Sequence, residues 1–313
     1  MASLQPEIDP ELLPINEVRP KTMGPLDAGN IKEARRLSKQ ALAALPDPAP
    51  DIVSVKHLVE TTDGSTDVYV YQPGGPNRSR ALLWFHGGGY VMGSGDDPLG
   101  KLLAADVGCT VVSVDYRLAP EHPYPAATED GIAALKWLRK DAVSLGVDEN
   151  RIAIGGASAG GGLAAGVTLL NRDSCEPMPI FQLLMYPMLD NLHDTKSGRI
   201  ADYPIWNRET SLNAWEMYLG GLPGDNASPY ASPSRANDLS GLPQTYLCVG
   251  DVDLFRDENI AFMQRLIAGG SPGEFEVYPG VYHGAEFQYP DANISRRMYS
   301  DMIEKLRQGL GII

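Results

Sequence analysis

The chain has 313 residues, of which 43% are hydrophobic, and carries a formal net charge of −14. A chain of this length holds one large or two small domains with a buried core, since domains average about 150 residues. Its composition excludes the disordered and fibrous classes of protein. The acidic balance disfavours nucleic acid as a partner, because an acidic surface repels phosphates. No run of about 18 apolar residues predicts a membrane span, and no leader sequence is predicted.

The three cysteines, Cys109, Cys175 and Cys248, are widely separated. An odd number of cysteines without C-x-x-C spacing argues against a disulfide framework and against a zinc site. We therefore expect no structural metal and a reducing compartment, the cytoplasm.

Residues 1–50 predict an N-terminal helical arm, because apolar side chains recur at helical spacing between Ile31 and Leu45. After Pro50, two strand-like runs at 52–61 and 66–72 flank Asp63-Gly64. Such a dipeptide between two strand-like runs predicts a hairpin with a two-residue turn.

From residue 81 onward, short apolar runs alternate with helical patterns. This rhythm predicts an α/β protein with a mostly parallel sheet and helices on both faces. Strands are expected at 81–85, 110–114, 152–155, 180–186, 245–249 and 275–278, and helices at 98–107, 126–142, 160–171, 258–268 and 295–309. Residues 191–235 break the alternation and predict a helical insertion between two core segments, 51–190 and 236–313.

Ser158 is the candidate nucleophile. It lies in Gly156-Ala157-Ser158-Ala159-Gly160, a Gly-x-Ser-x-Gly pattern between a strand and a helix. The pattern alone is weak, but in this context it predicts a nucleophile elbow, in which flanking glycines let a sharp turn lift the serine above the sheet. A glycine-rich phosphate loop is the alternative. It lacks the lysine and the glycine order that nucleotide sites require.

A serine nucleophile needs a histidine base oriented by a carboxylate. After an elbow, the chain order is expected to be serine, acid, histidine, so the base must follow Ser158. Only His193 and His283 do so. His193 lies in the insertion, before any strand that could present the acid, whereas His283 follows the last predicted strand. Asp251 and Asp253 both follow the strand at 245–249, and spacing does not separate them. Asp257 and Glu258 begin the next helix, where acids favour the helix dipole.

His86-Gly87-Gly88-Gly89-Tyr90 follows the strand at 81–85. Glycines at this position let backbone N–H groups face a ligand, as an oxyanion hole requires. We expect Gly88, Gly89 and the N–H of Ala159 to be the donors; a flexible glycine turn is the alternative.

With these segments in place, residues 50–313 resemble the hormone-sensitive-lipase-like family of α/β-hydrolase carboxylesterases. The resemblance rests on His86-Gly87-Gly88-Gly89, on the run from Val114 to Ala127, on the elbow, and on the segment from Asp253 to Glu258 followed by His283-Gly284. It implies an α/β-hydrolase fold with a helical cap formed by residues 1–50 and 191–235. It also implies that Asp253 orients His283, with Asp251 second. The family usually has Asp before the nucleophile, where this chain has Ala157.

The predicted function is that of a serine carboxylesterase acting on short to medium acyl esters through an acyl-enzyme, without metal or organic cofactor. The expected partner is a small-molecule ester, and a homodimer is an option that the sequence leaves open. Tyr90, Trp206 and Trp215 are candidate substrate-binding residues, with packing inside the cap as their alternative role. The rival functions are an amidase, thioesterase or lyase using the same site, or a non-catalytic small-molecule receptor on the same scaffold.

Overall fold

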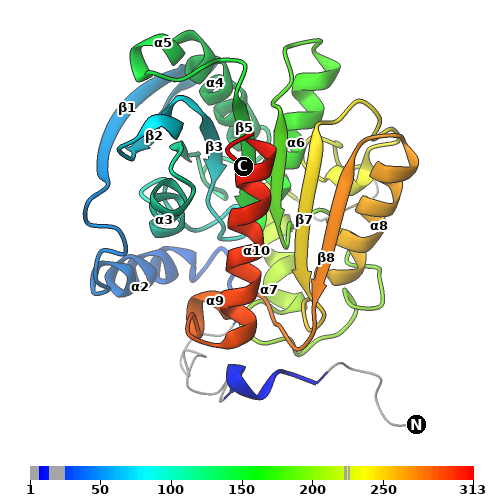
Figure 1. Ribbon diagram of the computed structural model, residues 1–313. Helices are drawn as coiled ribbons and strands as arrows, with labels where there is room; N and C mark the ends of the chain where they lie inside the picture. Colours follow the sequence, from blue (N-terminus) through cyan, green and yellow to red (C-terminus); the bar gives the residue numbers. More distant parts are fainter. Residues whose placement is uncertain (1–6, 14–24, 222–223, 225) are drawn as a thin grey trace.

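The computed structural model describes residues 7–13, 25–221, 224 and 226–313. They build one eight-stranded sheet with helices packed on it (Figure 1). The strands are β1 (Val53–Thr61), β2 (Gly64–Gln72), β3 (Ala81–Phe85), β4 (Thr110–Asp115), β5 (Ile152–Ala157), β6 (Phe181–Met185), β7 (Gln244–Gly250) and β8 (Gly273–Tyr278).

The strand order in the sheet is β1-β2-β4-β3-β5-β6-β7-β8. Strands β3 to β8 pair in parallel, whereas β2 runs antiparallel to both β1 and β4. The predicted mostly parallel sheet is therefore confirmed. All six strands expected after residue 80 are present, with ends that differ by at most two residues.

The hairpin between β1 and β2 differs from its prediction by one residue. Thr61 pairs with Gly64, so the two turn residues are Thr62 and Asp63 rather than Asp63 and Gly64. Gly64 has a φ of +138° and opens β2. The dipeptide identified a turn correctly, but its glycine supplies the positive φ at the first paired residue after the turn.

The helices flank the sheet. They are α2 (Ile31–Ala43), α3 (Pro98–Val107), α4 (Ala126–Lys140), α5 (Ala142–Leu145), α6 (Ala159–Asp173), α7 (Arg208–Leu219), α8 (Arg256–Ala268), α9 (Ala285–Gln288) and α10 (Asn293–Gly309), with 3-10 turns at Pro10–Leu12, Pro76–Ser79 and Pro233–Arg235. Helices α3 and α10 cover one face, α4 and α6 lie behind the sheet in Figure 1, and α8 packs on β7 and β8. The helix expected at 126–142 is two helices, α4 and α5, separated by Asp141.

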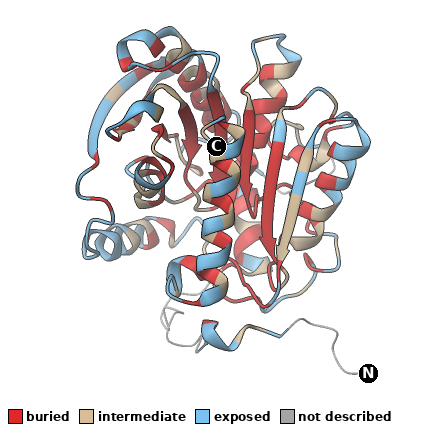
Figure 2. Ribbon diagram, in the orientation of Figure 1, coloured by how far each residue is buried: buried red, intermediate tan, exposed pale blue. Residues whose placement is uncertain are grey.

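The core lies along the middle of the sheet. Every residue of β3, β5 and β6 is buried, as expected for parallel strands covered on both faces. Figure 2 shows the contrast with β1, which exposes much of its length at one edge. The three cysteines are free, and only Cys175 is exposed. None of the helices in the described part of the chain is long and apolar enough to cross a membrane.

Two segments outside the alternating core lie at the same end of the molecule. Helix α2 belongs to the predicted arm, of which residues 1–6 and 14–24 lie outside the described residues. Helix α7 is the one α-helix in the described part of the insertion. Figure 1 shows both at the lower end of the view, toward which the arrowheads of β7 and β8 point. Asn213 of α7 donates a hydrogen bond to the carbonyl of Leu26 at 2.9 Å, so the two segments touch.

Candidate active site

Ser158 stands between β5 and α6, in a sharp turn. Its φ of +57° and ψ of −121° are rare for a residue with a side chain. A Cβ atom at Gly156 would lie 2.2 Å from the carbonyl oxygen of Gly160, and one at Gly160 would lie 2.0 Å from that of Phe85. Only glycine fits at either position, which explains why this local sequence makes so tight a turn.

His283 comes from the loop that follows β8 and contacts Ser158, and Asp253 comes from the loop that follows β7 and contacts His283. His283 Nε2 lies 3.0 Å from Ser158 Oγ, and its Nδ1 lies 2.8 Å from Asp253 Oδ2. With the proton on Nδ1, the imidazole donates to Asp253 and accepts from the serine hydroxyl. Ser158, Asp253 and His283 are all buried. The carboxyl ends of three parallel strands thus bring together three residues that are distant in sequence.

The structure separates the two aspartates that sequence spacing left equivalent. Asp253 Oδ1 accepts the N–H of Phe255 at 2.9 Å, which aims its other oxygen at His283. Asp251 Oδ1 instead accepts the N–H of Gly280 at 2.7 Å. Asp251 therefore holds the turn between β8 and His283, while Asp253 contacts the imidazole itself.

Two aromatic rings hold the imidazole of His283 in place, and sequence reasoning did not single them out for this role. Tyr186 and Phe255 meet the His283 ring edge-on, with centroids 4.6 and 5.2 Å away. Tyr186 also donates its hydroxyl hydrogen to buried Glu286. Burial raises the pKa of the Glu286 carboxyl. Tyr186 is the last residue of the strand expected at 180–186, and Glu286 lies three residues after His283. Their positions in the chain were the only signal that the sequence offered for this role.

The glycine loop after β3 lies directly against the elbow. A Cβ atom at Gly87 would be 3.2 Å from the carbonyl oxygen of Ala157. The carbonyl oxygen of Gly88 accepts N–H groups from Val91 and Met92, at 3.1 and 2.9 Å. Because the C=O and N–H of a trans peptide point in opposite directions, the N–H of Gly89 points away from that turn.

The run from Val114 to Ala127, the longest of the motifs that carry the resemblance, supports this loop. Tyr116 donates its hydroxyl hydrogen to the carbonyl of His86 at 2.8 Å, and the two rings stack with centroids 4.2 Å apart. Arg117 forms an ion pair at 2.9 Å with Asp130, whose side chain is fully buried. These contacts give the motif a structural role.

The three candidate substrate-binding aromatics occupy different places. Trp206 lies 6.5 Å from the His283 ring, and its Cη2 atom would be 2.3 Å from a Cβ at Gly89. Tyr90 and Trp215 have no exposed surface. Tyr90 stacks on Tyr218 with centroids 3.9 Å apart, and Trp215 packs beside both rings. Trp206 thus borders the site, whereas Tyr90 and Trp215 support neighbouring side chains rather than line an open pocket.

These features define the α/β-hydrolase class. They are a mostly parallel sheet, a strained serine at a strand-to-helix turn, and a histidine and an aspartate presented by later strands. A family described as an alpha/beta hydrolase fold matches residues 82–287. The chain belongs to this family, and the predicted resemblance to hormone-sensitive-lipase-like esterases is confirmed.

Similar proteins span almost the whole chain. Carboxylesterase NlhH from Mycobacterium tuberculosis is 36% identical and covers 90% of this chain and 89% of its own length. Ethyl acetate hydrolase from Pseudomonas putida is 32% identical, with coverage of 83% and 84%. Among solved structures, a bacterial heroin esterase has a TM-score of 0.88 at 35% identity, covering 97% of this chain and 98% of its own.

Proposed function

We propose that this esterase hydrolyses carboxylic esters through Ser158, His283 and Asp253 by way of an acyl-enzyme. The observation that carries the proposal is the unbroken chain of contacts from Ser158 Oγ through both nitrogens of His283 to Asp253. His283 Nε2 takes the hydroxyl proton as Oγ attacks the ester carbonyl carbon, and Asp253 stabilises the imidazolium that forms. The imidazolium then protonates the leaving alcohol. A water molecule, activated by the same nitrogen, releases the acid and regenerates the serine.

The negative charge that develops on the carbonyl oxygen needs donors, and we assign this role to the N–H groups of Gly88, Gly89 and Ala159. Ala159 is the first residue of α6, where an N–H has no partner within its own helix. The Gly89 N–H points away from the turn that the Gly88 carbonyl closes. Each such donor accelerates acyl transfer by about 10²- to 10³-fold.

For the substrate class we propose esters with short to medium acyl chains. Trp206 supports this choice, because its ring packs on the oxyanion loop and borders His283, which limits the space above Ser158. We further propose that residues 1–50 and 191–235 form one cap over the site, since Asn213 and Leu26 join the two segments by a hydrogen bond.

The test is the rate of ester hydrolysis by a variant that lacks the hydroxyl of Ser158. Ser158→Ala should lower kcat on p-nitrophenyl acetate by about 10⁴-fold or more, and should abolish labelling by a fluorophosphonate. Ser113→Ala is the matched control, because Ser113 is a fully buried serine of β4 in the same sheet and should leave activity and labelling intact. Retention of most activity by Ser158→Ala would refute the assignment. A wild-type protein that binds esters without turning them over would instead indicate the receptor function.

A further inference from the structure

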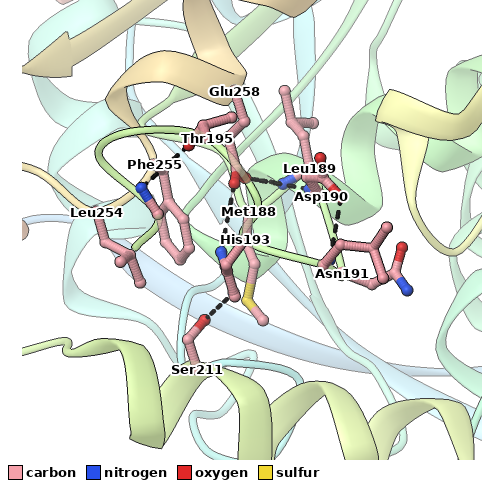
Figure 3. Close-up of polar contacts among 12 residues, drawn as sticks. Met188, Leu189, Asp190, Asn191, His193, Thr195, Ser211, Leu254, Phe255 and Glu258 are labelled. Atoms are coloured by element: carbon pink, nitrogen blue, oxygen red, sulfur yellow. Dashed lines mark hydrogen bonds and ion pairs between the residues drawn. The ribbon is translucent and has the colours of Figure 1, made fainter. Parts of the chain in front are cut away.

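A second group of buried polar side chains lies beside the candidate site. His193 has no exposed surface and follows β6 within the insertion, with a φ of +52°. Glu258 is 1% exposed and lies in the first turn of α8. Figure 3 shows them side by side, with Ser211 of α7 on the other side of the imidazole. Neither His193 nor Glu258 contacts Ser158 through a hydrogen bond.

The contacts of this group run from the core to α7. Glu258 Oε1 accepts the N–H groups of Leu189 and Asp190, at 2.8 and 3.1 Å. Its Oε2 lies 3.5 Å from His193 Nδ1, and His193 Nε2 lies 2.8 Å from Ser211 Oγ. A hydroxyl, an imidazole and a carboxyl group thus stand in the same order as in the candidate triad.

This second arrangement is not a second nucleophilic site. Ser211 has no exposed surface, so no substrate reaches its hydroxyl. It also lies within the regular α7, where its N–H bonds to the carbonyl of Asn207 at 3.0 Å, rather than on a strained turn. Without access, the group can act only by holding its neighbours in place.

The neighbours that it holds belong to the candidate active site. Ser211 and Ala214 are three residues apart on α7 and so share a helix face. The Ala214 Cβ would lie 3.3 Å from a Cβ at Gly89, so this face rests on the oxyanion loop. On the other side, the Phe255 ring stacks on His193 with centroids 5.8 Å apart, and meets His283 edge-on.

The electrostatic surroundings make the group sensitive to loss of any member. Burial raises the pKa of Glu258 to about 7; His193 lowers it, and nearby Asp190 raises it further. Asp190 is itself paired with Arg235. Loss of a hydrogen-bond partner costs more free energy for a buried polar atom than for an exposed one, because water does not replace the lost contact.

We propose that Glu258, His193 and Ser211 form a buried latch that positions α7 over the oxyanion loop and thereby sets the affinity for the ester. The proposal rests on the proposed function, since it assumes that esters bind between α7 and Ser158. The three side chains are positioning residues. Their loss should weaken substrate binding more than it disturbs catalysis, because Tyr186 and Asp253 still hold the imidazole of His283.

The experiment compares Ser211→Ala with a matched control, Ser271→Ala. Ser271 is also a buried serine, and its Oγ accepts the N–H of Leu242 and donates to the carbonyl of Leu239. It precedes β8, so it lies at the opposite end of that strand from His283. Alanine is favourable within a helix, so Ser211→Ala is expected to fold. Both variants are assayed for kcat, KM and thermal unfolding with p-nitrophenyl acetate.

Ser211→Ala should raise KM about five- to tenfold, the factor that one net buried hydrogen bond contributes to an equilibrium, with kcat changed less than about threefold. Glu258→Gln, which keeps an acceptor for Leu189 and Asp190 but loses the charge facing His193, should raise KM in the same way. Ser271→Ala should lower the unfolding temperature without changing KM. An unchanged KM in Ser211→Ala, or an equal rise in Ser271→Ala, would overturn the latch. Absence of turnover by the wild type would overturn the proposed function instead.

Discussion

Replacing Asp253 by Asn tests the assignment of the acid most sharply. Asp253 uses Oδ1 for the N–H of Phe255 and Oδ2 for Nδ1 of His283. An asparagine must keep its carbonyl oxygen on Phe255, so its amide hydrogens face Nδ1. His283 then carries its proton on Nε2, where it can no longer accept the proton of Ser158. The shape of the site is retained, and only the position of one proton changes.

The expected loss in kcat is about 10⁴-fold, the cost of the same change in a serine protease triad, or about 5 to 6 kcal/mol in transition-state free energy. The assay is steady-state hydrolysis of p-nitrophenyl acetate at neutral pH. Asp251→Asn is the matched control, because Asp251 lies two residues away and an amide oxygen can still accept the N–H of Gly280. It should keep activity within a few-fold. If Asp253→Asn retains more than a tenth of the activity, or Asp251→Asn loses as much, the reasoning fails.

Three further outcomes are expected. Gly89→Ala should lower kcat/KM at least tenfold, because its Cβ would lie 2.3 Å from Trp206; kinetics on the folded variant would show it. Iodoacetamide at neutral pH should label Cys175 in the native protein but not Cys109, since burial raises the pKa of the Cys109 thiol to about 12; peptide mass spectrometry reads this directly. The pKa of Glu258 is raised from 4.5 to about 7, so folding binds a proton and stability falls as pH rises through this window. Between pH 4.5 and pH 8, the free energy of unfolding measured with urea should fall by about 3 kcal/mol less in Glu258→Gln than in the wild type. An equal fall in both proteins would contradict this.

The fold was predictable because the central strands are short, buried and mostly apolar runs. Runs such as 81–85 and 152–155 are covered on both faces, so they are found by their continuous hydrophobicity and short length. Helix α9 was not expected, since four residues are too few to show a 3.6-residue period.

The candidate site was predictable only as far as chain order and local patterns reach. Spacing could not choose between Asp251 and Asp253, because both lie in one turn and only the directions of their side chains differ. On sequence alone, Glu258 is explained as an acidic residue that favours the dipole of the helix it begins, and His193 is rejected as the base because it precedes any strand that could present the acid. Their contact with each other and with Ser211 depends on three segments meeting in space, which no sequence spacing records.

The glycines around the nucleophile differ in the atoms that an added Cβ would meet. This difference decides which parts of the site can be altered by substitution and which cannot. At Gly156 and Gly160 the obstruction is main-chain carbonyl oxygen, and no substitution elsewhere removes a carbonyl. At Gly89 the obstruction is the side chains of Trp206 and Ala214, and the φ is +64°. A smaller residue at 206 would therefore relieve the main steric contact of a methyl group at 89, but not its backbone strain. The elbow is therefore closed to compensatory mutation, whereas the side chain at 206, which packs on the oxyanion loop, can be replaced without moving the elbow.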